Sequence, residues 1–290
     1  MLRAHKIALA PNNAQATHLA RACGVARFAY NWALAEWTRQ YEAWKADNSL
    51  PRPNQMALRR QLNAIKRSEF PWMLEVTKCA PQLAIMQQAF RNFFAKRAKY
   101  PRFRKKGIHD RFSISNDQFQ IESRRIRIPN LGWVRMREAL RFRGKIVSAT
   151  ISRVADRWFA SICVSVSDTD HAASLNLRSI PQAESQGAVG VDLGVLALAT
   201  LSTGEVISGP KALACLLPRL RRLSRSVARK QKGSANRRKA RLKLARYYAR
   251  IANIRADALH KLTTDLTRRF ELIGIEDLNV KGMLSNRHLS

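Results

Sequence analysis

The chain has 290 residues, of which 53 are Lys or Arg and 20 are Asp or Glu, so its formal net charge is +33. Because 46% of the residues are hydrophobic, the chain can bury a core, which excludes a disordered tail. A charge this large repels itself in a compact state unless a polyanion neutralises it, and nucleic acid is the expected polyanion. An acidic membrane surface is the alternative, but the sequence contains no long apolar span and no lipidation motif.

Targeting and zinc-binding signals are also missing from the sequence. The N-terminus has no apolar signal-peptide core, so we expect a cytoplasmic protein. The four cysteines lie far apart and form no CxxC pair, so we expect no zinc site in this chain.

The first hundred residues carry mainly helical patterns after one short strand. The strand is expected at Lys6 to Leu9, and a long helix follows from about Ala14 to Asp47, with aromatic residues at helical spacing. Two further helices are predicted over Gln55 to Ile65 and Pro81 to Lys99.

From Tyr100 onward the pattern changes to short strands separated by turn residues, which is typical of a small barrel or sandwich. The predicted strands cover residues 126–128, 133–136, 146–154 and 158–166. A polar stretch over residues 167–187 has little periodicity and reads as a linker.

The last segment predicts a small α/β domain over residues 188–290. Strands are expected at 189–193, 196–201 and 205–207, followed by a helical hairpin with an apolar seam. Apolar residues that step by three and four positions, Leu213 and Tyr248 among them, are assigned to this seam. One more strand then ends at Glu276. This order of elements is that of the RNase H-like fold, so we expect an α+β multidomain protein.

Two of these strands each deliver a carboxylate at the C-terminal end, Asp192 and Glu276. If the strands are parallel neighbours, about 4.8 Å apart, both carboxylates can reach one metal ion. Mg²⁺ prefers carboxylate oxygen and water, so the pair predicts metal-assisted phosphodiester cleavage. The alternative is that Asp192 is a strand-end turn acid and that Glu276 favours the first turn of a helix.

Two basic clusters accompany the carboxylates. Residues 206–256 contain no Asp or Glu, so their cations cannot form the ion pairs along the helix that a solvated helix normally makes. This composition favours a phosphate-binding role for the segment. The second cluster, Tyr100 to Gly107, places Phe103 among cations, where it could stack on a base or simply pack in the core. The predicted nucleic-acid-binding residues are Arg102, Arg104, Lys105, Lys106, Arg221, Arg222, Arg225, Arg229, Lys230, Lys232, Arg237, Arg238 and Arg241.

Several blocks of the sequence resemble the transposon-encoded OrfB/TnpB family, relatives of the RuvC-type CRISPR nucleases. The most specific are Val189 to Gly194 and Ile275 to Met283, and further blocks are Phe28 to Leu34, Ala98 to Lys106 and Ile128 to Gly132. The resemblance implies an RNA-guided DNA endonuclease of a bacterial mobile element, long described as a transposase. It implies guide RNA and target DNA as partners, Mg²⁺ as cofactor, nucleoid association, and no membrane or small-molecule substrate.

The resemblance also implies a domain plan. A wedge-like β-barrel is expected over residues 1–10 and 100–166, with a helical insertion at 11–99 for nucleic-acid recognition. A RuvC domain with its first two acids at Asp192 and Glu276 is expected over residues 188–290.

The sequence departs from the family in one large way. The third catalytic aspartate and the four-cysteine zinc element have no counterpart in residues 1–290, so we expect an incomplete RuvC domain and a C-terminally truncated chain. Asp257 and Asp265 each precede a cation by four residues and are predicted to form helix-surface ion pairs instead. The alternative functions are a nuclease-inactive DNA- or RNA-binding protein and a structural RNA-binding protein that uses the basic helices alone.

Overall fold

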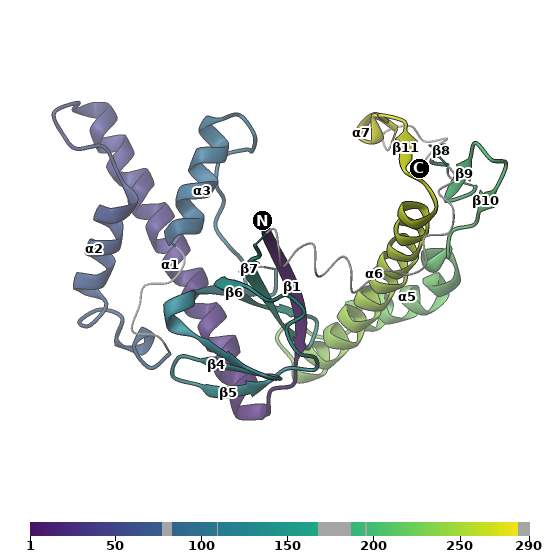
Figure 1. Ribbon diagram of the computed structural model, residues 1–290. Coiled ribbons are helices and arrows are strands. Elements are labelled where there is room, and N and C mark those ends of the chain that lie inside the picture. Colours follow the sequence, from purple (N-terminus) through teal and green to yellow (C-terminus); the bar gives the residue numbers. More distant parts are fainter. Residues whose placement is uncertain (77–82, 109, 168–186, 195, 284–290) are drawn as a thin grey trace. The chain divides into compact units, whose positions relative to one another are not determined.

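The computed structural model describes residues 1–76, 83–108, 110–167, 187–194 and 196–283 (Figure 1). The chain divides into two compact units, Met1–Leu175 and Asn176–Ser290. The boundary falls within the polar stretch that the sequence predicts as a linker, a stretch that lies mostly outside the described residues.

The first unit contains two antiparallel sheets. One has the order β1 (Leu2–Leu9), β7 (Arg157–Ser165), β6 (Lys145–Val154) and β2 (Arg111–Ser115), and the other has the order β3 (Gln120–Glu122), β4 (Arg125–Ile128) and β5 (Gly132–Arg135). An isolated antiparallel β-bridge between Leu9, at the end of β1, and Met136, just after β5, connects the two sheets. At the other side the 3-10 turn η2 (Asn116–Gln118) separates β2 from β3. The strands confirm a β-rich segment, but the described residues do not close the expected barrel.

The described part of the first unit contains three α-helices. They are α1 (Asn13–Ala46), α2 (Gln55–Ile65) and α3 (Leu83–Phe94), and a 3-10 turn, η1 (Pro71–Met73), follows α2. A reciprocal capping box between Asn12 and Gln15 starts α1, which satisfies donors that the first helical turn leaves free. The predictions for α1 and α2 are confirmed within one residue. The third helix ends five residues earlier than predicted, because Lys96 adopts a left-handed backbone with φ 57°.

Helix α1 contributes to two separate cores of this unit. Its N-terminal half packs with both sheets through residues such as Leu19, Val25 and Ala26. Its C-terminal half packs Ala33 and Leu34 with α2 and α3. One continuous helix therefore connects the sheet core to the helical part.

The second unit is a four-stranded sheet with a long helical hairpin. The sheet has the order β10 (Val206–Ile207), β9 (Ala199–Leu201), β8 (Ala188–Asp192) and β11 (Leu272–Ile275). The helices are α5 (Ala212–Ala228), α6 (Ala235–Arg269) and the short α7 (Val280–Met283). The C-terminal end of α6 covers one face of the sheet, because Leu266 and Phe270 share a core with Val189, Val191 and Leu201.

The predicted hairpin is confirmed, with a corrected seam. Leu220, Tyr247 and Ile251 are buried between α5 and α6. Leu213 and Tyr248, which the spacing assigns to the seam, are 51% and 53% exposed. Pro218 lies inside α5, where its ring nitrogen has no hydrogen to donate to the helical backbone.

Among the described helices, none has an apolar stretch long enough to cross a membrane.

Candidate nucleic-acid and metal site

The two predicted carboxylates lie at the ends of neighbouring parallel strands. Strands β8 and β11 pair in parallel, with Gly274 opposite Gly190 and Ile275 opposite Val191. The next step in this register puts Glu276 level with Asp192, and neighbouring strands lie about 4.8 Å apart. Both acids are exposed. Val189 and Ile273 belong to the core shared with α6, so the alternation of side chains assigns positions 192 and 276 to the opposite face of the sheet, although Ile275 beside Glu276 is itself 69% exposed. The predicted parallel arrangement of the strands is confirmed.

The floor beside the carboxylates is made of glycine. Gly190 and Gly274 are paired two residues before Asp192 and Glu276, on the same face. A Cβ atom added at Gly190 would meet Ser202 at 3.6 Å, and one at Gly274 would meet the Val189 carbonyl at 3.8 Å, which are ordinary contacts. The fold itself therefore does not require glycine at either position. With glycine there, no side chain stands on the sheet directly beside Asp192 and Glu276.

No third metal ligand joins the pair within the described part of the chain. No group of three or more His, Cys, Asp or Glu side chains there could hold a metal ion. Asp257 is paired with Lys261 at 2.7 Å and Asp265 with Arg269 at 3.0 Å, which confirms the predicted helix-surface ion pairs. Exposed carboxylates such as Asp192 and Glu276 supply the oxygen ligands that Mg²⁺ prefers in proteins.

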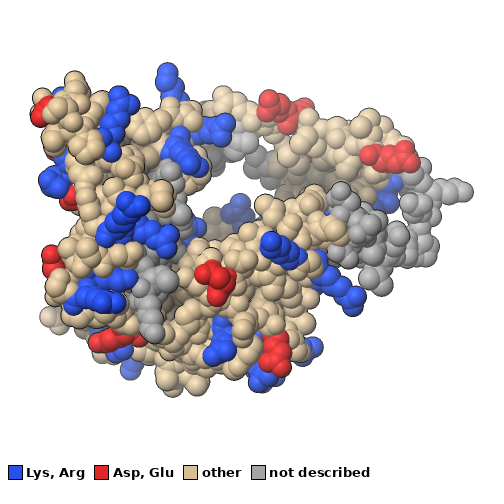
Figure 2. Space-filling model, turned by 60° about the vertical axis from the view of Figure 1, so that its left-hand side comes forward, with Lys and Arg blue, Asp and Glu red and all other residues tan. Residues whose placement is uncertain are grey.

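The basic hairpin presents most of its predicted cations to solvent. The exposed members are Arg221, Arg222, Arg225, Arg229, Lys232, Arg238 and Arg241. Lys230 and Arg237 are half-buried near the start of α6, where the Arg237 guanidinium donates to the Lys230 carbonyl at 2.9 Å. In the described residues none of these side chains pairs with a carboxylate, so their charge is available for phosphate groups. Lys and Arg side chains are likewise more widespread than Asp and Glu on the molecular face drawn in Figure 2.

The second basic cluster is fastened to helix α1 by contacts that the sequence does not reveal. The Asn31 side chain accepts a hydrogen bond from the Arg104 amide at 2.7 Å and donates to the Arg104 carbonyl at 3.1 Å. The Arg104 guanidinium lies over the Tyr30 ring, 3.8 Å from its centroid, and the residue is buried.

This geometry gives Arg104 an anchoring position inside the first unit. Arg102, Lys105, Lys106 and the ring of Phe103 remain exposed. Tyr30 and Asn31 belong to one of the family-like sequence blocks, but spacing alone gives no signal that they hold a loop more than seventy residues away.

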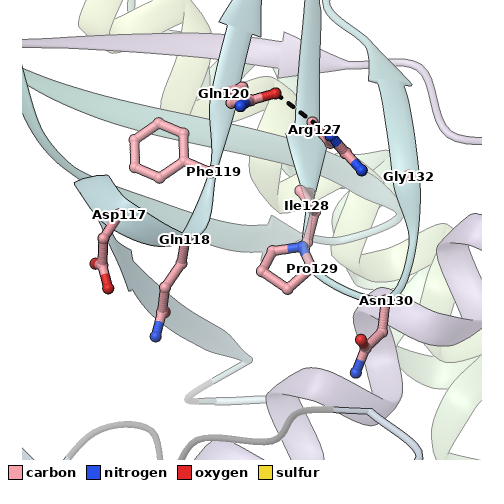
Figure 3. A pocket seen from close by; sticks show the side chains of 9 residues that line it. All are labelled: Asp117, Gln118, Phe119, Gln120, Arg127, Ile128, Pro129, Asn130 and Gly132. Carbon is pink, nitrogen blue, oxygen red and sulfur yellow. Dashed lines mark hydrogen bonds between the residues drawn. The ribbon is translucent and has the colours of Figure 1, made fainter.

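A separate hollow of about 420 Å³ lies in the first unit, beside the three-stranded sheet (Figure 3). Amide side chains of Gln118, Gln120 and Asn130 line it, together with the Phe119 ring and the Asp117 carboxylate. Arg127 donates to Gln120 at 3.5 Å, and Asn130 donates to the Val76 carbonyl at 3.2 Å. No predicted site residue lies in this hollow.

Residues 161–287 match the IS605 OrfB family, described as "Probable transposase", and residues 1–45 match its "Helix-turn-helix domain". In residues 1–45 the structure has one strand and a single uninterrupted helix, so the second description does not correspond to the fold seen there.

Several curated proteins are similar over almost the whole chain. "Putative RNA-guided DNA endonuclease InsQ" of Escherichia coli K12 is 36% identical, across 97% of this chain and 67% of its own length. "Putative RNA-guided DNA endonuclease" of Streptomyces pristinaespiralis is 37% identical, across 99% of this chain and 70% of its own length. "Putative RNA-guided DNA endonuclease Rv2885c" of Mycobacterium tuberculosis is 30% identical, across 99% and 68%.

A solved structure titled "Cryo-EM structure of the Cas12f1-sgRNA-target DNA complex" aligns with all of this chain and 76% of its own, at 10% sequence identity. Its TM-score of 0.33 is too low to establish a shared arrangement of elements.

Proposed function

Because the chain belongs to the OrfB family of IS605-type transposon proteins, we propose that it acts as an RNA-guided DNA endonuclease with Asp192 and Glu276 as its metal-binding carboxylates. The observation that carries this proposal is the parallel register of β8 and β11, which brings two acids 84 positions apart to one sheet edge. The partners proposed for the chain are a guide RNA and a target DNA. In such a protein, base pairing with the guide reads the target sequence.

Each part of the chain has a distinct task in this proposal. The carboxylate oxygens of Asp192 and Glu276 would hold Mg²⁺, and the bound ion would polarise a phosphoryl oxygen and lower the pKa of a water molecule. The glycine floor of Gly190 and Gly274 lets a sugar–phosphate backbone come close to the carboxylates. The exposed arginines of α5 bind further phosphates and so hold the strand in place.

Nucleic-acid binding without cleavage is the competing function. It is favoured by the absence of a third acidic ligand from the described residues. Because a second metal ion requires further ligands, two carboxylates alone favour weak metal binding. We therefore propose that efficient cutting requires the additional acid that the family supplies from a more C-terminal segment.

Divalent-metal titration and plasmid cleavage test the proposal together. Manganese binding to the 290-residue chain should be weakened by Asp192→Asn and by Glu276→Gln, whereas Asp257→Asn should leave it unchanged, because Asp257 is held by Lys261. The chain joined to the C-terminal segment of a relative should cut plasmid DNA only with a guide RNA, and both substitutions should abolish that cutting. If the joined Asp192→Asn variant cuts as well as its parent, Asp192 is only a turn residue and the nuclease assignment fails.

A further inference from the structure

The outward face of the four-stranded sheet in the first unit carries short hydroxyl side chains. The strand register aligns them in rows that run across β1, β7, β6 and β2. The first row holds Lys6, Ser161, Thr150 and Ser113, the second Ala4, Cys163, Ser148 and Ser115, and the third Ala8, Phe159, Ser152 and Arg111. We call these residues the hydroxyl face.

The hydroxyl face is open, because the alternate residues of the same strands form the core. Ile7, Ile151 and Ile162 are fully buried on the opposite side, whereas every residue of the hydroxyl face is partly or fully exposed. Exposed strand positions are usually filled by β-branched or aromatic residues, which favour the extended backbone. The five serines of this face have a lower strand propensity than those residues, so neither core packing nor strand propensity explains why serine occupies these positions.

The charge of this face has a single sign. None of the four strands contains Asp or Glu, while Lys6 and Arg111 stand on the two edge strands. Lys145 and Arg157 extend the positive charge at the ends of the rows, on the same side of the sheet. A polyanion is therefore the complementary partner.

We propose that the hydroxyl face binds the minor groove of duplex RNA. The minor groove of an A-form helix is wide and shallow and displays 2′-hydroxyl groups, so a flat surface can lie against it. Four strands span about 14 Å, which is three spacings of about 4.8 Å. Serine and threonine hydroxyls both donate and accept, so they can pair with 2′-hydroxyls as well as with phosphate oxygens. The minor groove of undistorted B-DNA, about 6 Å wide, does not admit a sheet of this width.

The hydrogen bond between the Ser113 and Thr150 hydroxyls, 2.9 Å long, shows how closely these groups are spaced. The hydroxyl face shares no residue with the carboxylate site, so the inference can fail while the proposed nuclease function holds.

Cys163 provides a reporter at the centre of the hydroxyl face. Its thiol is free and partly exposed, whereas Cys23 is buried, and burial raises the pKa of the Cys23 thiol to about 12. In the full chain with Cys79→Ser and Cys215→Ser, alkylation therefore reports on Cys163. We expect an RNA duplex to slow this alkylation strongly, and a DNA duplex of the same sequence to leave it nearly unchanged under the same salt conditions.

Removing hydroxyls provides the second measurement. The triple variant Ser113→Ala, Ser148→Ala and Ser161→Ala keeps the surface flat, and it should lose roughly two- to tenfold in affinity for duplex RNA per hydroxyl. Ser49→Ala and Ser68→Ala, both exposed and outside the sheet, are matched controls that should bind as the parent does. Equal protection of Cys163 by both duplexes, protection by single-stranded RNA alone, no protection, or unchanged affinity of the triple variant would each overturn the proposal.

Discussion

At the scale of single residues, Asn31 joins a helix to a loop through the backbone of Arg104. Its amide makes two hydrogen bonds, at 2.7 and 3.1 Å, to a partly buried amide and carbonyl. Asn31→Ala leaves both groups without this partner, so we expect a loss of about 1–3 kcal/mol in the free energy of unfolding. Asn48→Ala, on the exposed turn after α1, should change stability by less than about 0.5 kcal/mol. Thermal melts of both variants measure the difference, and equal melting temperatures would contradict an anchoring role for Asn31.

His5 makes stability depend on pH. Burial, followed by the positive charge of Arg141, lowers the pKa of this imidazole below 6.5, although nearby Glu138 acts in the opposite direction. The Arg141 amide donates to Nδ1 at 3.3 Å, which holds the ring in its neutral form. Since the unfolded chain takes up the proton more readily, stability should fall as the pH drops through about 6.5.

The variant His5→Asn isolates this contribution. It removes the titrating ring, so its loss of stability between neutral and mildly acidic pH should be smaller than that of the parent. Burial also lowers the pKa of His18, but His18 is present in both proteins and cancels in the comparison. Parallel pH curves for parent and variant would show that His5 does not contribute.

At the scale of elements, the hairpin of α5 and α6 separates its packing face from its charged face. Leu220, Tyr247 and Ile251 form the seam, while Arg221, Arg222 and Arg225 are exposed. Changing these three arginines to glutamate should therefore leave circular dichroism unchanged but weaken nucleic-acid binding. The slope of log affinity against log salt should also become shallower by about 0.9 for each duplex phosphate that the variant no longer binds. Unchanged binding by a folded variant would mean that the arginines are only solvated.

The glycine floor between β8 and β11 makes a complementary test, because its role is one of space. Gly190→Ala and Gly274→Ala fit the fold with ordinary contacts, so stability should change by less than about 1 kcal/mol. We expect guide-dependent cutting by the C-terminally extended protein to fall in both variants, because a methyl group then occupies the approach to the carboxylates. Gly209→Ala, whose Cβ would also meet only an ordinary contact at 3.5 Å, is a matched control. Cutting at the parental rate would show that the backbone of the substrate does not approach this floor.

At the scale of the whole molecule, the charge of +33 dominates association. Binding to any polynucleotide should weaken linearly on a plot of log affinity against log salt, because counterions are released from the nucleic acid. A protein that binds six to ten phosphates loses on the order of a thousandfold or more in affinity between low and physiological salt. A filter-binding titration with flat affinity over this range would contradict a phosphate-binding role for the basic residues.

The sequence by itself predicts much of the secondary structure and the two parallel strands that precede Asp192 and Glu276. Periodicity places α1, α2 and the hairpin because each helix buries a continuous apolar stripe. The acids at 192 and 276 follow short apolar runs, and the order of elements predicts that those strands are neighbours. Composition alone predicts a phosphate-binding surface over residues 206–256, because this segment contains many Lys and Arg but no Asp or Glu.

Other features are decided only in three dimensions. The hydroxyl face depends on the register of four strands from distant parts of the chain, and a shift of one residue would turn each serine of a strand into the core. Tyr247 replaces Tyr248 in the seam because the phase of a long helix is set by its partner. Arg104 lies on Tyr30 because α1 passes beneath the loop. Local pattern cannot predict such pairings, because they depend on which surfaces meet after the chain has folded.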